Sequence, residues 1–209
     1  SRSTMRRFLL LTHRVPVHGE FTLNDLAGGG GRTDEIARVV STAFTLSNDL
    51  RRDTELTIVF PAALPAETRR IRLVGSRLRH LNPDERSTAA LVKNALVRSI
   101  AFPSEFESSP GLIVAAADPI EELRRFLQLP NVVWLVEGGE PLRKWKGNPA
   151  EFSAVLSDPY DPTDGERGAL ATSGAVRVSV GPRSLRSSQV VDIVHNELDL
   201  REAAGKPPT

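Results

Sequence analysis

Cysteine is absent from the 209 residues of this chain, and histidine and aromatic residues are scarce. Without cysteine the chain can form no disulfide, thiolate metal site or cysteine nucleophile. The four histidines, at positions 13, 18, 80 and 195, follow none of the spacings that are typical of metal-binding motifs. We therefore expect neither a metal site nor cysteine chemistry.

Long hydrophobic runs are missing too, since no stretch approaches the roughly 18 apolar residues of a membrane span. No apolar segment precedes a small-residue cleavage site near the start, as it would in a secretory signal. With 40% hydrophobic and 25% charged residues, the composition is that of a globular protein. We expect a cytoplasmic protein without a membrane partner: residues 1–5 a tag remnant or extension, 6–200 a single domain, and 201–209 a frayed tail.

The net charge is only +1, but the charges are unevenly distributed. Residues 1–100 carry 16 lysines and arginines against 10 acidic residues, whereas residues 101–209 carry 11 against 16. The planar guanidinium group suits phosphate, so a basic half is compatible with RNA binding, and the alternative is a solvated surface. The candidate RNA-binding residues are Arg52, Arg69, Arg70, Arg72, Arg77, Arg79 and Arg86.

Short apolar segments alternate with helical patterns along the chain. Strands are predicted at 8–11, 56–60, 71–74, 111–115, 132–136, 152–156 and 176–180. Helices are predicted at about 34–48, 82–99, 118–128 and 187–198, the second beginning at Asn82 with Pro83 in the first helical position. This alternation predicts an α/β fold with a mostly parallel sheet and helices on both faces.

Three consecutive strands in the C-terminal half end in small or polar residues, at 135–139, 156–158 and 180–185. Ligands of such sheets bind beyond the carboxyl ends of the strands. Neither the GxGxxG fingerprint of dinucleotide sites nor a P-loop is present. The three loops therefore predict a ligand pocket of another kind, with tight turns that bind nothing as the alternative.

Several motifs, in matching order and spacing from about residue 6 to 200, resemble the archaeal TrmY family. These are the tRNA pseudouridine N1-methyltransferases of the SPOUT superfamily. The motifs are Gly31-Arg32-Thr33-Asp34, the segment 44–53, Val74-Gly75-Ser76, the segment 82–87, Ser109-Pro110-Gly111, the segment 178–182 and the segment 193–199. The last loop is similar to a bacterial branch of the family, and Ser157-Asp158-Pro159 stands where archaeal members have Gly-Asp-His.

The resemblance implies a SPOUT-type α/β fold, a trefoil knot within about residues 131–200, and a homodimer. It also implies that S-adenosylmethionine binds in the three loops. The implied cofactor-binding residues are Leu135, Ser157, Ser179, Val180, Gly181, Pro182, Arg183, Ser184, Leu185 and Val190. The implied activity is methylation of N1 of pseudouridine in the tRNA T-loop, at position 54. The alternatives are a pseudouridine in ribosomal RNA, a free C-nucleoside, or a homologue that binds RNA or a nucleotide without catalysis.

Methylation at N1 requires alignment of this nitrogen with the methyl group and removal of its proton. A carboxylate can take or orient the proton, and guanidinium groups can offset charge on the uracil oxygens. We expect Asp49 to fill the first role and Arg32, Arg51 and Arg52 to hold phosphate or base. Asp49, Arg51 and Arg52 follow the end of the predicted helix 34–48. Arg32 and Asp34, at the start of that helix, are the other candidate pair.

Overall fold

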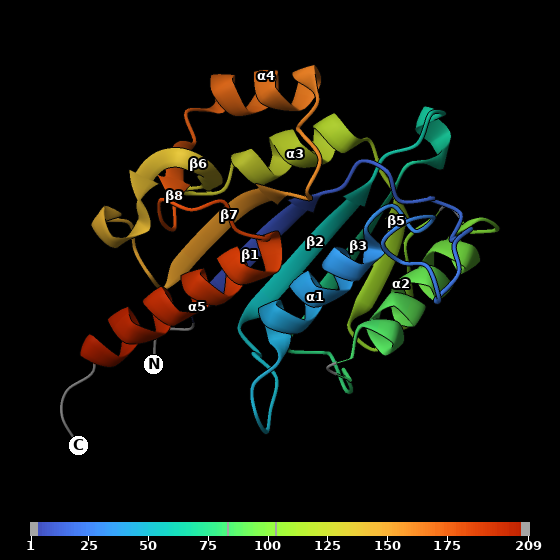
Figure 1. Cartoon of the computed structure of the whole chain (residues 1–209), viewed down its shortest axis with the longest axis horizontal. Helices are drawn as coiled ribbons and strands as arrows, with labels where there is room; N and C mark the ends of the chain where they lie inside the picture. Colours follow the sequence, from blue (N-terminus) through green and yellow to red (C-terminus); the bar gives the residue numbers. More distant parts are fainter. Residues whose placement is uncertain (1–3, 83, 103, 206–209) are drawn as a thin grey trace.

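The computed structural model describes residues 4–82, 84–102 and 104–205 and contains an eight-stranded sheet of order β4-β5-β3-β2-β1-β7-β6-β8 (Figure 1). The neighbours β2-β1-β7-β6-β8 pair in parallel, and β3, β5 and β4 extend the sheet by antiparallel pairs. The sheet is thus mostly parallel, as predicted, with an antiparallel edge. The strands are β1 (Met5–Leu11), β2 (Thr54–Phe60), β3 (Arg69–Val74), β4 (Phe106–Ser109), β5 (Leu112–Ala116), β6 (Val133–Pro141), β7 (Glu151–Ser157) and β8 (Val176–Ser179).

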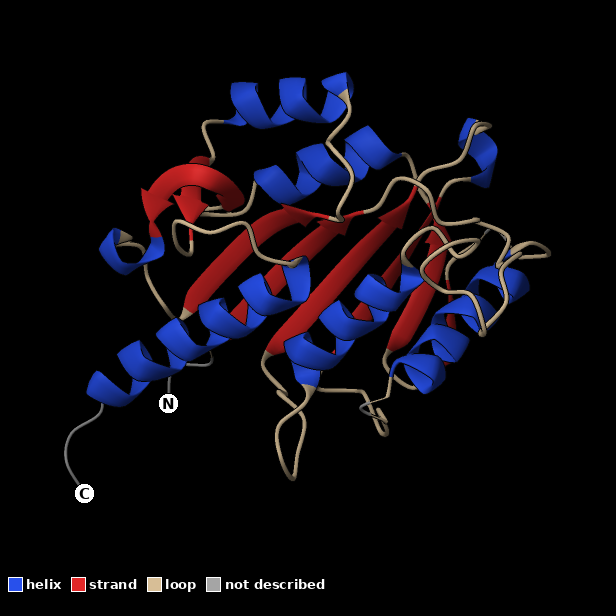
Figure 2. Cartoon of the chain, viewed as in Figure 1, coloured by secondary structure: helices blue, strands red, loops and turns tan. Residues whose placement is uncertain are grey.

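Helices cover both faces of the sheet, which confirms the predicted layers (Figure 2). One layer holds α1 (Thr33–Phe44), α2 (Glu85–Ser99) and α5 (Ser187–Ala204), and the other holds α3 (Pro119–Leu127) and α4 (Asp164–Ser173). Two short 3-10 turns, Pro65–Glu67 and Leu142–Lys144, follow β2 and β6. In the described part of the chain, no helix is both long enough and apolar enough to cross a membrane.

The central strand β1 is apolar on both sides because both of its faces are covered. Phe8 and Leu10 belong to the core cluster beneath α1 and α5, whereas Leu9 and Leu11 pack in the cluster beneath α3 and α4. All four side chains are 1% exposed. Burial on both faces is typical of parallel strands and explains the continuous apolar run in the sequence.

Helix α5 is fixed to β1 by a buried polar network at its centre. The Arg6 guanidinium lies 2.9 Å from His195 Nδ1 and 2.9 Å from Asp199 Oδ1. His195 Nε2 lies 3.0 Å from the Ala43 carbonyl oxygen, to which it donates. Burial, together with Arg51 and Arg6, lowers the pKa of His195 to about 3, so the ring is neutral and accepts from Arg6.

The predicted end of α1 and the predicted start of α2 are wrong. Helix α1 ends at Phe44, four residues before the predicted end, because Thr45 is extended and forms a bridge with Leu50. Helix α2 begins at Glu85, with Asp84 as its N-cap accepting from Ser87 N at 2.8 Å, so Asn82 is not the cap. The predicted role of Pro83 lies outside the described residues.

The chain contains regular structure where none was predicted. Helix α4 begins with a capping box in which Thr163 accepts from Glu166 N and Glu166 accepts from Thr163 N. Only Glu166, Ala169 and Leu170 are buried in α4, so its apolar periodicity is weak. The edge strand β4 has four residues, none of them buried.

Both expected terminal boundaries change. Met5 belongs to β1, and its backbone nitrogen donates to the Ala150 carbonyl oxygen at 2.9 Å, so the fold includes the last residue of the expected 1–5 extension. Helix α5 continues to Ala204, and Arg201 donates to the Trp145 carbonyl oxygen at 2.6 Å. Residues 201–204 are therefore ordered helix and not part of a frayed tail.

Candidate active site

A cavity of about 370 Å³ opens where β6, β7 and β8 end or leave the sheet. These parallel strands bring their carboxyl ends to one edge, the place where ligands bind in open α/β sheets. Seven of the ten predicted cofactor-binding residues line this cavity: Leu135, Ser179, Val180, Gly181, Arg183, Leu185 and Val190. The three loops singled out from the sequence therefore meet in one place.

A second cavity of about 610 Å³ adjoins the first and shares the segment 179–181 with it. Pro182, another predicted residue, lines this cavity together with Gly138, Gly139, Pro141, Leu142 and Arg143. A Cβ atom added to Gly138 or Gly181 would meet no atom within 4 Å, so both glycines border open space. On Gly139 it would lie 2.7 Å from Val178 N, so the close approach of β6 to β8 requires glycine there.

Ser157 and Ser184 are not among the residues that line either cavity. Ser157 instead fastens neighbouring segments, because its carbonyl oxygen accepts from Ser187 Oγ at 2.6 Å and its hydroxyl donates to the Tyr160 carbonyl oxygen at 3.3 Å. Ser184 is exposed in the loop before α5. Their contact with a cofactor remains a prediction.

The smaller cavity also has charged residues that the sequence analysis missed. Glu137 and Asp161 line it as exposed carboxylates, and Arg183 adds a guanidinium. Such a site suits a ligand that carries a cationic centre together with a carboxylate. The signal was present in the sequence, because Glu137 directly follows the predicted strand 132–136 and Asp161 lies in the loop after the predicted strand 152–156.

His13, at the end of β1, is held between two carboxylates. Its Nδ1 lies 2.7 Å from Asp158 Oδ1, and its Nε2 lies 2.7 Å from Glu166 Oε1. Burial lowers the pKa of His13, but the hydrogen bonds to Asp158 and Glu166 outweigh it and raise the pKa to about 9. The ring is therefore an imidazolium at neutral pH. Asp158 lines the cavity, and His13 does not.

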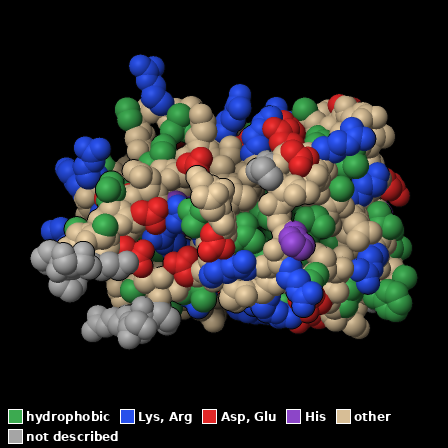
Figure 3. Space-filling model, turned by 90° about the horizontal axis from the view of Figure 1, so that it is seen from below, with side chains coloured by type: hydrophobic (Ala, Val, Ile, Leu, Met, Phe, Trp, Pro, Cys, Tyr) green, Lys and Arg blue, Asp and Glu red, His purple; other side chains and the backbone are tan. Residues whose placement is uncertain are grey.

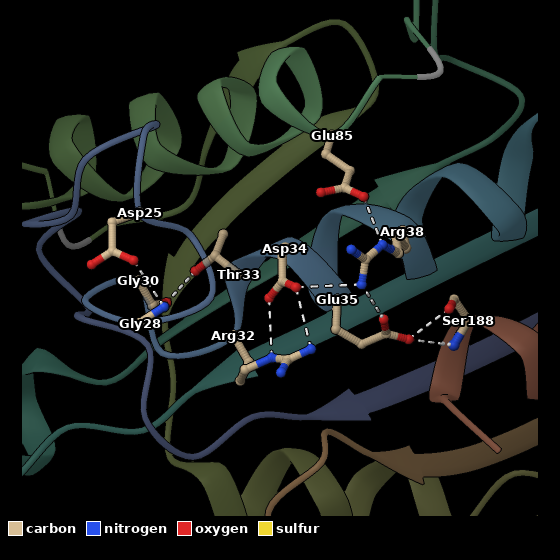
Figure 4. A network of polar contacts seen from close by, with 10 residues as sticks. All are labelled: Asp25, Gly28, Gly30, Arg32, Thr33, Asp34, Glu35, Arg38, Glu85 and Ser188. Atoms are coloured by element: carbon tan, nitrogen blue, oxygen red, sulfur yellow. Dashed lines mark hydrogen bonds and ion pairs between the residues drawn. The ribbon is translucent and has the colours of Figure 1, made fainter.

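The first turn of α1 lies beside the start of α5 and carries one of the two candidate catalytic pairs (Figure 4). The Arg32 Nε atom lies 3.1 Å from Asp34 Oδ1, and Arg38 contacts the other oxygen of Asp34 at 3.3 Å. Buried Glu35 accepts from the backbone nitrogen and the hydroxyl of Ser188 at 2.9 and 2.6 Å. This joins α1 to the helix that supplies Val190 to the cavity. Arg32 and Asp34 therefore lie at the same edge of the sheet as the cavity, although neither residue lines it.

Asp49 and Arg51 lie at the opposite end of α1. A helix of 12 residues is about 18 Å long. The Asp49 side chain is 67% exposed, and its carboxylate accepts from Leu50 N at 2.7 Å. Arg51 donates to both carboxylate oxygens of Asp199 at 3.0 and 2.9 Å. Within one chain, the structure does not bring these two residues together with the cavity.

Arg69 corrects the predicted set of RNA-binding residues. It is 5% exposed, and its guanidinium donates to Ser99 Oγ at 3.2 Å and to the Ala66 carbonyl oxygen at 2.8 Å. A side chain in this position holds β3 against α2 and is not available to RNA.

The other predicted RNA-binding arginines have some exposure but are mostly paired. Arg70 contacts Glu122 and Glu105 at 3.0 and 2.7 Å, and Arg52 donates to the carbonyl oxygens of Gly75 and Leu78. Further partners are Glu55 for Arg72, Glu107 for Arg77 and Asn24 for Arg86. Arg79 is exposed and forms no ion pair with the described residues. On the face seen in Figure 3, basic side chains are interspersed with acidic ones and form no continuous patch.

No group of three or more histidine or acidic side chains that could hold a metal ion occurs within residues 4–82, 84–102 and 104–205.

A solved structure has a similar fold. The crystal structure of Archaeoglobus fulgidus Nep1 bound to S-adenosylhomocysteine matches with a TM-score of 0.64 and 12% sequence identity, over 96% of this chain and 99% of that chain. At this identity the likeness shows the fold alone, which agrees with the α/β fold expected from the sequence.

Sequence comparisons show the family. A family model described as "Putative SAM-dependent RNA methyltransferase" matches residues 5–203. The chain is 38% identical over 198 residues to the tRNA (pseudouridine(54)-N(1))-methyltransferase of Methanocella arvoryzae, covering 94% of this chain and 100% of the relative. It is also 38% identical to the enzyme of the same name from Haloferax volcanii, over 93% of this chain and 96% of the relative. The chain therefore belongs to the TrmY family of SAM-dependent RNA methyltransferases.

Proposed function

We propose that this protein transfers the methyl group of S-adenosylmethionine to N1 of the pseudouridine at position 54 of tRNA. One observation carries the proposal: the loops expected to hold the cofactor form a cavity at the strand ends. They do so in a chain that is 38% identical, over 94% of its length, to a relative named for this reaction. We place the reaction in the cytoplasm, where tRNA is modified.

The residues around the cavity fit S-adenosylmethionine. Gly138 and Gly181 leave room beside the backbone for the adenosine part. Glu137 and Asp161 offer negative charge to the sulfonium and the amino group, and Arg183 suits the carboxylate of the methionine part. When bound, S-adenosylmethionine supplies an electrophilic methyl group, so the protein must chiefly align the acceptor nitrogen and manage its proton.

Arg32 and Asp34 are the pair we assign to the target base. Pseudouridine is joined to ribose through carbon, which leaves N1–H free and weakly acidic. In this assignment the Asp34 carboxylate holds or accepts this proton, and its ion-pair partner Arg32 offsets charge on the uracil oxygens. Their place at the cavity edge of the sheet supports this assignment over Asp49, which could act at a cavity only if a second copy supplied it.

We also propose that the C-terminal part is knotted and that the protein is a homodimer. Leu135 and Glu140 of β6 both pair with Val178, so residues 136–139 leave the pairing with β8 before β6 rejoins it. The knot is proposed on the resemblance to the TrmY family. Helix α5 leaves Ile193 and Leu200 exposed by 37% and 59%, which suits contact with a second copy.

Labelled S-adenosylmethionine and two tRNA transcripts test the proposed function. One transcript carries pseudouridine at position 54 and the other carries uridine. Transfer to the pseudouridine transcript alone is expected. Binding of S-adenosylhomocysteine without transfer to either transcript would contradict the tRNA substrate. Ribosomal RNA, free nucleosides and a non-catalytic role would then be the remaining possibilities.

A further inference from the structure

The loop after β7, residues 158–162, forms one wall of the smaller cavity. Asp158, Pro159, Tyr160, Asp161 and Pro162 all line it. A cofactor binds tightly to such a wall only if the wall is already in place, because ordering a loop on binding costs affinity. The contacts that hold loop 158–162 therefore bear on cofactor affinity.

His13 holds the buried end of loop 158–162. The backbone nitrogen of His13 donates to Asp158 Oδ2 at 2.9 Å, and its ring Nδ1 donates to Asp158 Oδ1 at 2.7 Å. The other ring nitrogen donates to Glu166 of α4 at 2.7 Å. The side chains of His13, Asp158 and Glu166 are 9%, 1% and 6% exposed. Both ring nitrogens face carboxylate oxygens, which is the arrangement of an imidazolium shared between two anions.

Arg14 holds the outer side of the same loop. Its guanidinium carbon lies 4.0 Å from the centre of the Tyr160 ring, within the range of a cation–π contact. The Tyr160 backbone nitrogen in turn donates to Asp158 Oδ1 at 3.1 Å. His13 and Arg14, which follow β1, thus contact loop 158–162 from its buried side and from its exposed side.

We propose that His13 and Arg14 are positioning residues that hold loop 158–162 as a preformed wall of the cofactor cavity. This inference rests on the proposed function. Neither residue is among those that line the cavity, so both act through Asp158 and Tyr160. The Asp158 carboxylate accepts three hydrogen bonds, which makes it an anchor for the loop.

The consequence is a selective effect on the cofactor. The contacts of His13 and Arg14 with loop 158–162 involve one wall of the cavity and leave the Arg32–Asp34 pair unchanged. Their loss should therefore raise the KM for S-adenosylmethionine more than it lowers kcat. The KM for tRNA should stay within about twofold of the wild type. A role in overall stability alone would lower the melting temperature without this split.

Binding of S-adenosylhomocysteine to the full chain, measured by calorimetry, tests the inference. His13→Gln should weaken binding about tenfold, and Arg14→Ala about threefold. Arg14→Lys, which keeps the cation over the ring, should stay within about twofold of the wild type. Arg98→Ala is the matched control, because Arg98 makes a similar contact at 5.3 Å with the Phe106 ring, between α2 and β4.

The outcomes separate the inference from the proposed function. Wild-type binding with an unchanged Kd in both His13→Gln and Arg14→Ala would overturn the inference alone. No binding to the folded wild type would overturn the proposed function and the inference with it. If His13→Gln does not fold, the variants of the exposed Arg14 still test the inference. Arg14→Ala must then weaken S-adenosylhomocysteine binding, and Arg14→Lys must bind like the wild type.

Discussion

Asp34 and Asp49 lie at the two ends of α1, and in one chain only the Asp34 end lies beside the start of α5, the helix that supplies Val190 to the cavity. Replacing the carboxylate by an amide keeps the shape but removes the negative charge and the proton acceptor. We expect Asp34→Asn to lower kcat about 100-fold, the usual range for general acid–base groups, with cofactor affinity unchanged. Single-turnover methylation of the pseudouridine transcript measures this effect.

Asp49→Asn tests the competing assignment in the same assay. If Asp49→Asn lost all methylation activity while Asp34→Asn kept normal turnover, the catalytic role would belong to Asp49. It would require the loop before β2 of a second copy to reach the cavity.

Gly181 offers a second test at the level of one residue. An added Cβ there meets no atom within 4 Å, so a large side chain can be accommodated without unfolding but would occupy the cavity. We expect Gly181→Trp to abolish measurable S-adenosylhomocysteine binding while the melting temperature changes little. Gly168→Trp is the matched control, because this glycine also faces open space but lies exposed on α4. Normal binding by Gly181→Trp would place the cofactor elsewhere.

Three elements meet at the His13 imidazolium, since His13 follows β1, Asp158 follows β7 and Glu166 begins α4. The pKa of His13 is about 9 in the folded protein, above its ordinary value of 6.5. The unfolded chain therefore binds this proton less tightly. The stabilisation is complete below about pH 6.5 and disappears as the pH rises through 9.

Urea denaturation at pH 6.5, 8 and 10 measures this dependence. The free energy of unfolding of the wild type should fall by about 2 kcal/mol across the range, more than in His13→Gln, which lacks the titrating ring. Parallel pH profiles of the two proteins would show that the His13 contacts add no pH-dependent stability.

The sequence predicts well the helices and strands that have many buried residues. The elements that it fails to predict have physical explanations. Strand β1 and helix α3 stand out through Leu9, Leu11 and the Asp118 cap, which accepts from Glu121 N at 2.9 Å. Helix α4 is missed because little more than Ala169 and Leu170 faces the core. The antiparallel direction of β3 is set by its neighbours β2 and β5, so its own residues do not encode it.

The cofactor-binding loops could be predicted from the sequence because they follow the ends of parallel strands. The positions of the catalytic candidates relative to the cavity could not, because they depend on tertiary structure. Loops at the ends of β6, β7 and β8 had to meet at one edge, and they do. The predicted helix 34–48 already put Asp34 and Asp49 at opposite ends, but only the fold shows that the Asp34 end lies beside the start of α5. The burial of Arg69 was accessible from alternation, because Arg69 shares one face of β3 with the core residues Ile71 and Leu73.

Across the molecule, several of the arginines proposed for RNA binding are paired with acids, among them Arg70, Arg72 and Arg77. The face seen in Figure 3 shows no continuous basic patch, so we expect RNA affinity to come from a few exposed guanidiniums. Arg77 and Arg79 follow β3 and are exposed, and Arg79 makes no ion pair with the described residues. Each arginine that neutralises an RNA phosphate adds a salt-dependent term to affinity.

The double variant Arg77→Gln and Arg79→Gln should weaken tRNA binding about tenfold at moderate salt. It should also reduce the slope of log affinity against log salt by about 0.7 for each phosphate that the protein no longer neutralises. Binding of S-adenosylhomocysteine should not change. The control removes the same charge from the other helical layer, through Arg124→Gln and Arg167→Gln in α3 and α4, where both arginines are exposed. Equal losses of affinity in the two double variants would mean that tRNA responds to net charge alone. An unchanged affinity in the first would assign RNA recognition to other residues, with those beside the cavity, Arg32 first, as the next to replace.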